Sequence, residues 1–262
     1  MDTIHVERAD GVVTVTLDRP ERKNALTHRE WGRLHEVFGE VAERPEDRVL
    51  VVTGAGGDFC SGADVSAFGD DERSSLDAVR AVGRTAAALL HLPKPTIAKV
   101  DGVAVGAGCN LALACDLVVA SDRARFSEIF ARRGLSLDFA GSWLLPRLVG
   151  LQRAKQLAFF ADIVDAGEAQ RLGLVTEVVP AAELDAFVGR WATRLADGPA
   201  VALSLSKGLL NAATTMSLDA ALEAEAVAQA HNLGGPEARE ALRAFRERRE
   251  PRFRDAGPPR GG

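Results

Sequence analysis

The chain has 262 residues, of which 47 % are hydrophobic and 26 % charged, values typical of one sizeable globular domain. A formal net charge of −5 argues against a general nucleic-acid binder, and no apolar run approaches the roughly 20 residues of a membrane-spanning helix. The three cysteines lack metal-ligand spacing and the N-terminus lacks a secretory pattern. We therefore expect a cytoplasmic protein with free thiols, no metal site, no nucleic-acid partner and no membrane attachment.

The first predicted elements are a β-hairpin and a helix. Residues 4–17 alternate between apolar and polar side chains, and Asp10-Gly11 interrupts them with a sequence typical of tight hairpin turns. Thr27 and Glu30 have the spacing of a capping box, in which each side chain binds the other residue's backbone N–H. We therefore expect a helix to begin just after Thr27.

The middle of the chain alternates short apolar strands with helical segments, which predicts an α/β fold. Strands are expected at 49–53, 96–100 and 117–120, and a helix at 78–91. Residues 66–80 are charged and weakly periodic, so we expect a surface loop that leads into this helix. Only helical patterns follow Glu183.

Two glycine-containing loops carry the strongest chemical signal. Residues 59–64 read Phe-Cys-Ser-Gly-Ala-Asp after a strand, and residues 106–110 read Gly-Ala-Gly-Cys-Asn at a helix start. Unpaired N–H groups at a helix start stabilise negative charge, and small residues let a ligand approach the backbone. If both loops face one cleft, two N–H groups can bind one oxygen, as in an oxyanion hole. Phosphate binding and tight packing of turns are the alternative interpretations.

The chain resembles the enoyl-CoA hydratase/isomerase (crotonase) family from residue 4 to about residue 250. No single motif is specific, but the motifs are specific in combination. They are Leu-Asp-Arg-Pro at 17–20, Asn-Ala-Leu at 24–26, the two loops at 59–64 and 106–110, Cys-Asp at 115–116, Ala-Arg-Phe at 124–126, Gly-Leu at 134–135, Trp-Leu-Leu-Pro-Arg at 143–147 and Gly-Leu-Val at 173–175.

This resemblance implies a crotonase-like spiral of ββα repeats with a C-terminal helical region, assembled into homotrimers or hexamers. We divide the chain into an acyl-CoA-binding core at 1–195 and an oligomerisation region at 196–262 that ends in a frayed tail. Coenzyme A is implied as part of the substrate, and no other cofactor is expected. The family motifs assign the N–H groups of Ala63 and Ala107 to the thioester oxygen; family members commonly carry glycine where Ala107 stands.

The same resemblance assigns further residues to the coenzyme A path. These residues are Lys23, Ala25, Leu26, Ala63, Asp64 and Val65. Phe130 and Phe245 complete the predicted substrate-binding residues. Asp64 is expected to fix its own loop rather than take part in chemistry. The stretch 243–260 holds seven arginines against three acids. One interpretation is a solvated helix face. The resemblance implies another, in which these basic residues and Phe245 cover the coenzyme A that is bound to a neighbouring subunit.

The available carboxylates decide which reaction is expected. Hydratases of the family use two glutamates, whose positions are occupied here by Asn110 and Phe130, and neither side chain exchanges protons near neutral pH. Asp138, in Gly-Leu-x-x-Asp-x-x-Gly-Ser-Trp at 134–143, resembles the single acid/base of phenylacetate-pathway isomerases. A lone base suffices to shift a proton, and with it a double bond, through an enolate. A turn or helix-cap aspartate is the alternative interpretation of Asp138.

We therefore predict an acyl-CoA isomerase of fatty-acid or phenylacetate metabolism. Its predicted catalytic residues are Asp138, Ala63, Ala107 and Asn110. Asn110 is expected to bind the thioester region or a water, or else to be satisfied by backbone groups. Leu135, Leu137, Phe130 and Phe139 are expected to surround the base and raise its pKa. An enoyl-CoA hydratase with an atypical site and a non-catalytic acyl-CoA-binding protein remain as alternatives.

Other side chains receive structural interpretations. Glu128 and Arg132 have the i,i+4 spacing of a solvated ion pair. The five histidines are scattered, so we expect them on the surface and outside the cleft. Trp143 lies in a predicted helix beside the cleft and is expected to be a core residue rather than a platform for the substrate.

Overall fold

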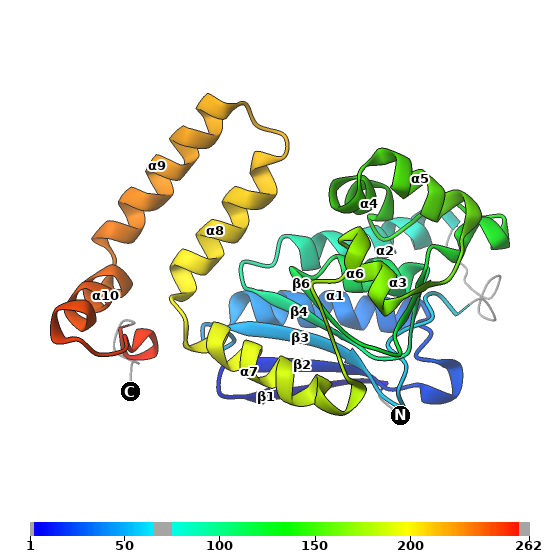
Figure 1. Cartoon of the computed structure of the whole chain (residues 1–262), viewed down its shortest axis with the longest axis horizontal. Helices are drawn as coiled ribbons and strands as arrows, with labels where there is room; N and C mark the ends of the chain where they lie inside the picture. The colour runs from blue at the N-terminus through cyan, green and yellow to red at the C-terminus, as the bar shows by residue number, and fades with distance from the viewer. Residues whose placement is uncertain (1–2, 65–74, 257–262) are drawn as a thin grey trace.

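The computed structural model describes residues 3–64 and 75–256, and its centre is a six-stranded β-sheet (Figure 1). The strands of this sheet are β1 Ile4–Ala9, β2 Val12–Leu17, β3 Val49–Gly54, β4 Thr96–Val100, β6 Leu117–Ser121 and β9 Glu177–Val179. They lie in the order β1-β2-β3-β4-β6-β9, with β1 and β2 antiparallel and all other neighbours parallel. The three strands predicted in the middle of the chain are confirmed as β3, β4 and β6.

Helices cover both faces of this sheet. α7 lies on one face, and α1, α2 and α3 on the other. The helices of the described residues are α1 His28–Glu43, α2 Ser75–Leu90, α3 Ala107–Leu113, α4 Gly141–Val149, α5 Leu151–Phe160, α6 Ala166–Leu172, α7 Leu184–Asp197, α8 Ala200–Ala213, α9 Leu218–Gly234 and α10 Pro236–Glu247. Val49 and Val51 of β3 belong to the apolar cluster beneath α7, whereas Leu50 and Val52 belong to the larger core with α1, α2 and α3. Because side chains alternate across a strand, β3 contributes to both cores.

The predicted loop before α2 lies mainly outside the described residues. The expected loop covered 66–80, of which the structure describes 75–80. Those six residues are helical, so α2 begins at Ser75, three residues earlier than predicted. The prediction of a helix in this stretch is confirmed, and the helix is longer at its N-terminal end than predicted.

A second sheet shows how the chain winds into a spiral. Its strands are β5 Val103–Val105, β7 Arg125–Ser127 and β8 Val164–Asp165. β5 follows β4 and leads into α3, while β7 follows β6 and leads through a short 3-10 helix, Ile129–Arg133, into α4. An isolated bridge between Cys60 and Ala104 adds the corresponding pairing for the segment between β3 and α2. Successive ββα turns therefore follow one another, and the predicted crotonase-like α/β fold is confirmed.

Local signals at the N-terminus are confirmed. β1 and β2 form a hairpin whose turn residues, Asp10 and Gly11, have φ values of 49° and 77°, as a tight hairpin turn requires. α1 begins directly after Thr27, and the backbone N–H of Thr27 donates to the Glu30 carboxylate at 2.7 Å. The capping box therefore fixes where the first helix starts.

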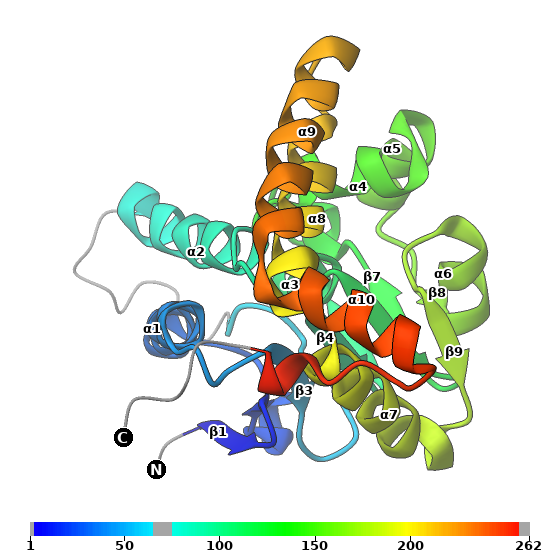
Figure 2. The ribbon, with the colours of Figure 1, turned by 90° about the vertical axis from the view of Figure 1, so that its left-hand side faces the viewer.

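Helices α8, α9 and α10 form a C-terminal arm that stands beside the sheet (Figures 1 and 2). Arg48 donates to the carbonyl oxygen of Ala196 at 2.6 Å, and Lys207 of α8 pairs with Asp116 at 2.8 Å. Large apolar side chains of the arm are exposed, namely Leu210, Leu218, Leu222, Val227, Leu233, Leu242 and Phe245. The role of 196–262 in oligomerisation stays a prediction. Within the described ranges, no helix combines the length and apolarity needed to cross a bilayer.

Candidate active site

The two glycine-containing loops lie side by side. Cys60 donates its N–H to the carbonyl of Val103 at 2.9 Å and accepts the N–H of Val105 at 2.9 Å. Gly108, in the first turn of α3, makes this approach possible, because a Cβ there would lie 2.2 Å from the carbonyl oxygen of Cys60. The loop at 59–64 is thus held against the N-terminus of α3.

The backbone N–H groups of Ala63 and Ala107 take no part in this pairing. Leu26 instead pairs with the residues on either side of Ala63. Its N–H binds the carbonyl of Gly62 at 2.8 Å and its carbonyl accepts the N–H of Asp64 at 2.9 Å, so the N–H of Ala63 points away from Leu26. Ala107 is the first residue of α3, and its N–H therefore has no acceptor within the helix. Among residues 3–64 and 75–256, neither N–H has a backbone acceptor.

Gly62 lies against the start of α3. Its φ is +92°, and a Cβ on it would lie 3.3 Å from the nitrogen of Ala107. The residue before Ala63 therefore touches the N-terminus of α3. In the described part of the chain, two N–H groups without backbone acceptors thus lie on adjoining segments, and such an arrangement is chemically suited to binding an oxyanion.

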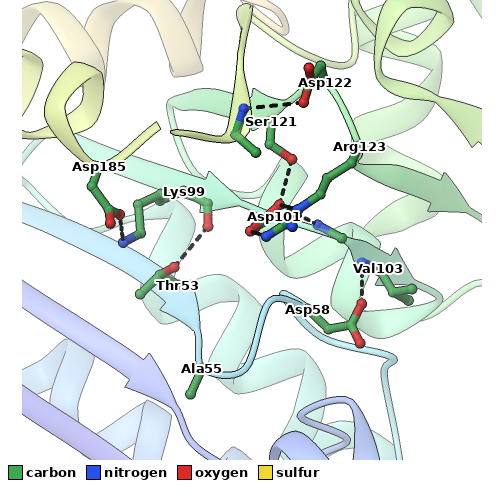
Figure 3. A network of polar contacts seen from close by, with 12 residues as sticks. Thr53, Ala55, Asp58, Lys99, Asp101, Val103, Ser121, Asp122, Arg123 and Asp185 are labelled. Carbon is green, nitrogen blue, oxygen red and sulfur yellow. Dashed lines mark hydrogen bonds and ion pairs between the residues drawn. The ribbon is translucent and has the colours of Figure 1, made fainter. Parts of the chain in front are cut away.

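Polar contacts connect the segments that follow β3, β4 and β6, at the C-terminal ends of these strands (Figure 3). The Asp58 carboxylate accepts the N–H of Val103 at 2.8 Å, which ties the loop after β3 to the turn between β4 and β5. The Asp101 carboxylate accepts hydrogen bonds from Ser121 and Arg123, both at 2.6 Å, which tie that turn to the end of β6. The Arg123 hydrogen bond also lowers the pKa of Asp101, so this carboxylate stays charged.

The segment assigned to coenzyme A lies against the first loop. Arg19 donates to the carbonyl of Ala25 at 2.7 Å and to the Asp64 carboxylate at 3.0 Å. Leu26 is buried, whereas the Lys23 side chain is 61 % exposed. Asp64 thus joins the two segments through Arg19. That this surface binds coenzyme A stays a prediction.

A cavity of about 70 Å³ brings Asp138 together with Ala63. Its lining residues are Leu26, Thr27, His28, Trp31, Ala63, Asp64, Val79, Val82 and Asp138. Burial raises the pKa of Asp138 to about 6. Its Oδ1 is buried and has no hydrogen-bond partner within the described part of the chain. A carboxyl with this pKa and a free oxygen is suited to proton transfer near neutral pH.

Asn110 and Phe130 are both buried and lie outside the lining of this cavity. Asn110 donates from Nδ2 to the backbone carbonyl of Asp138 at 3.0 Å. The Phe130 ring lies 3.7 Å from where a Cβ on Gly106 would be, so it packs behind the start of α3. Direct contact of Asn110 or Phe130 with substrate stays a prediction. Leu135 is 48 % exposed, and its predicted part in burying Asp138 stays a prediction.

Two other predicted substrate-binding residues remain. Val65 lies outside the described residues. Phe245, on α10, is 82 % exposed. Its ring is therefore available to a neighbouring subunit.

The turn that carries Asp138 is strained. Gly141 donates its N–H to the carbonyl of Asp138 at 2.9 Å, and the two residues between them, Phe139 and Ala140, have φ values of 44° and 60°. Non-glycine residues rarely adopt this left-handed region. Burial of Phe139 against Trp31, with ring centroids 5.0 Å apart, offsets part of the strain.

Replacing Ala140 with glycine is expected to raise the free energy of unfolding by about 0.5–1 kcal/mol, because glycine adopts positive φ without crowding by a Cβ. Thermal unfolding of the purified variant checks this. The control is Ala230→Gly within α9, which is expected to lower stability by about 1 kcal/mol. Equal losses from both substitutions would show that the turn is not strained.

Three predictions about single side chains are wrong. Glu128 is 3 % exposed rather than solvated, and Arg132 pairs instead with Asp162 at 2.9 Å. His28 lines the cavity beside Asp138 although the histidines were expected outside the cleft. Trp143 is 38 % exposed and lines a larger cavity of about 630 Å³ between α2, α4 and α8, so it is not a core residue.

The chain is similar to known proteins over nearly its whole length. The family described as Enoyl-CoA hydratase/isomerase matches residues 7–256. A Rhodobacter capsulatus protein described as an enoyl-CoA hydratase is 39 % identical over 259 residues, which cover 96 % of this chain and 97 % of that protein. The 1,2-epoxyphenylacetyl-CoA isomerase of Escherichia coli is 38 % identical over 256 residues, which cover 95 % of this chain and 96 % of the isomerase.

The solved structures agree as well. A crystal structure described as that of an enoyl-CoA hydratase from Streptomyces coelicolor A3(2) superimposes with a TM-score of 0.92 at 41 % identity. The match covers 96 % of this chain and 94 % of that one. Similarity thus extends over both the sheet core and the C-terminal arm.

Proposed function

Because the chain belongs to the enoyl-CoA hydratase/isomerase family, we propose that it is an acyl-CoA isomerase that shifts a double bond through an enolate. The N–H groups of Ala63 and Ala107 bind the enolate oxygen, and Asp138 transfers the proton. The observation that supports this most strongly is the cavity that holds the Asp138 carboxyl beside Ala63. Asp64 lines the same cavity but is paired with Arg19 at 3.0 Å, which makes Asp138 the better base.

In the proposed reaction Asp138 acts first as a base and then as an acid. Its carboxylate takes a proton from the carbon next to the double bond, and the electron pair of that C–H bond delocalises into the thioester carbonyl. The oxygen becomes negative and accepts two backbone hydrogen bonds, which stabilise the enolate. The carboxyl then returns its proton to the far carbon of the conjugated system, and the double bond moves. Proton and electron pair balance without an oxidant or a reductant.

A hydratase with an atypical site is the second candidate, and the descriptions of several relatives favour it. In that case Asp138 alone would activate the water. Asn110 and Phe130 argue against it, because they stand where family hydratases carry glutamates and neither exchanges protons. A non-catalytic acyl-CoA-binding protein is the third candidate; the raised pKa and free oxygen of Asp138 argue for an active enzyme.

Matched thioester substrates separate these functions. An isomerase converts a 3-enoyl-CoA into a conjugated 2-enoyl-CoA and raises the absorbance of the enoyl thioester, whereas a hydratase bleaches that absorbance in crotonyl-CoA. We expect turnover of a 3-enoyl-CoA or of 1,2-epoxyphenylacetyl-CoA and little hydration of crotonyl-CoA. Rapid hydration without isomerisation would contradict the isomerase. Binding of all three esters without turnover would indicate a binding protein.

The isomerase rate is expected to rise with pH as Asp138 ionises. Burial raises the pKa of Asp138 to about 6, and only the ionised form removes a proton. The value of kcat/KM should therefore increase up to about pH 6 and then level off, whereas an ordinary aspartate would level off near pH 4. A rate that is constant between about pH 5 and about pH 7 would contradict this role of Asp138.

We also propose a homotrimer or hexamer assembled through the C-terminal arm, with acyl-CoA as the substrate and no further cofactor. The exposed apolar side chains of the arm support assembly, because large apolar surfaces on soluble proteins are usually interfaces. Phe245 would then cover coenzyme A bound to a neighbouring subunit. Sedimentation of the full chain tests the assembly, and a monomer at micromolar concentration would contradict it.

A further inference from the structure

Glu128 is a buried carboxyl outside the cavity that holds Asp138. It follows β7 directly, is 3 % exposed, and its Oε1 lacks a hydrogen-bond partner among the residues that the structure describes. Most side chains around it are apolar: Phe126, Leu145, Leu157, Val164 and Leu174. A charged carboxylate is unfavourable in such surroundings, so the neutral acid is favoured. Burial, aided by the nearby Asp138 charge, raises the pKa of Glu128 to about 7 although hydrogen bonds from Cys109 and Asn110 lower it.

The side chain of Asn110 connects Glu128 to Asp138. Its Nδ2 donates to the backbone carbonyl of Asp138 at 3.0 Å and to Oε2 of Glu128 at 3.3 Å. The orientation of the amide is fixed, because a backbone carbonyl only accepts hydrogen bonds and must therefore face the NH₂ group. Gly141 closes over the amide, since a Cβ there would lie 2.4 Å from Nδ2.

The bond from Asn110 holds the strained turn. The carbonyl of Asp138 accepts both this bond and the N–H of Gly141, and the left-handed Phe139 and Ala140 lie between. A strained turn persists only where surrounding contacts determine it. Loss of the Asn110 contact would therefore let the turn relax and move the Asp138 carboxyl relative to Ala63.

We propose that Glu128 is a positioning residue for Asp138: as a neutral acid it holds the Asn110 amide, which in turn fixes the turn that aims the Asp138 carboxyl into the cavity. This inference rests on the proposed role of Asp138 as the acid/base. Glu128 is not among the residues that line the cavity with Ala63, so it acts through Asn110 and not on the substrate. Below its pKa of about 7 it is mostly protonated and places no second negative charge beside the base.

The groups that face Glu128 are consistent with a neutral acid. The titratable ones are the Asp138 carboxyl and the Cys109 thiol, whose pKa burial raises well above its ordinary value. Helices α4 and α5 present Leu145 and Leu157. Arg132, in the adjoining 3-10 helix, pairs with Asp162 instead.

Two substitutions and a matched control test the inference in the full-length enzyme. Glu128→Gln keeps the shape of the neutral acid and an acceptor for Asn110, so kcat should stay within about 3-fold of wild type. Glu128→Leu removes the acceptor and should lower kcat by about 10²-fold, as misplaced catalytic groups do, with KM nearly unchanged. Ser127→Ala removes a neighbouring buried hydrogen bond, to the carbonyl of Ala161 at 3.1 Å, and should leave kcat within about 3-fold.

The outcomes separate positioning from a general loss of structure. A Leu variant with wild-type kcat would overturn the inference, and so would a Gln variant as impaired as the Leu variant. Loss of kcat in Ser127→Ala equal to that in Glu128→Leu would show a structural role only.

Infrared spectroscopy tests the neutral form without relying on catalysis. In Asp138→Asn, where the other buried carboxyl no longer contributes, a protonated carboxyl band at about pH 6 should persist, because an ordinary glutamate is ionised at that pH. The band should vanish when Glu128→Gln is added to Asp138→Asn. Absence of this band in Asp138→Asn would overturn the inference whether or not the Leu variant folds. If Asp138→Asn keeps its activity while the band is present, the proposed function fails and the protonation of Glu128 stands.

Discussion

Replacing Asp138 with asparagine is expected to lower kcat for isomerisation by about 10³-fold, while the dissociation constant of the acyl-CoA stays nearly unchanged. Asparagine keeps the size of the side chain but can neither accept nor return a proton. Oδ1 of Asp138 has no hydrogen-bond partner in the described part of the chain, so exchanging one carboxyl oxygen for an NH₂ group disturbs little of the structure. Initial rates with a 3-enoyl-CoA measure kcat, and titration calorimetry with a coenzyme A thioester measures the dissociation constant.

The same variant is expected to gain stability relative to wild type at pH 8 but not at pH 4. The folded pKa of Asp138, about 6, lies above the ordinary aspartate value, so the folded state favours the protonated form. The contribution of Asp138 to the free energy of unfolding is therefore complete below about pH 4 and is lost as the pH rises through about 6. Thermal unfolding at the two pH values measures this difference.

Asp162→Asn is the control for Asp138→Asn, because Asp162 is an exposed carboxylate paired with Arg132. It should leave both kcat and stability nearly unchanged. Turnover by Asp138→Asn within a few-fold of wild type would exclude Asp138 as the acid/base and would return it to the interpretation of a turn residue.

The second large effect is expected from Ala107→Pro, which removes one backbone N–H. Ala107 is the first residue of α3, where proline is well tolerated because its missing N–H has no helical partner. Loss of one oxyanion donor should lower kcat/KM by about 10²–10³-fold, while the melting temperature changes little. Steady-state kinetics measures kcat/KM, and scanning calorimetry of the same preparation measures the melting temperature.

Leu151→Pro provides a matched control for the backbone substitution. Leu151 is the first residue of α5, it is 61 % exposed, and it also follows a glycine with positive φ, Gly150. Equal loss of activity in both proline variants would show that proline disturbs the fold rather than an oxyanion hole. Full activity of Ala107→Pro would exclude the N–H of Ala107 from catalysis.

Elements with a local physical cause could be predicted from the sequence. The turn at Asp10 needs residues that tolerate positive φ, and the start of α1 needs the cap that Thr27 and Glu30 supply, so both were visible in short motifs. The alternation of apolar strands and helices predicted the α/β class. The assignment to a spiral came from the resemblance, because no local pattern specifies how ββα turns stack.

The environment of single side chains could not be predicted in the same way. Glu128 and Arg132 have the spacing of a helical ion pair, but a 3-10 helix follows Glu128 and turns the two apart. His28 reaches the cavity only because α1 packs beside α2 and the turn that bears Asp138. Trp143 is half-exposed because the arm leaves a cavity between α4 and α8. These positions depend on contacts between distant segments, which periodicity does not encode.

The thioester oxygen of a bound acyl-CoA defines whether the two loops form one anion-binding site. A crystal structure with a non-reactive coenzyme A thioester should place that oxygen about 2.7–3.1 Å from both backbone nitrogens, those of Ala63 and Ala107, with the Asp138 carboxyl beside the carbon chain. An oxygen bound elsewhere, or held by only one of these nitrogens, would contradict the enolate chemistry.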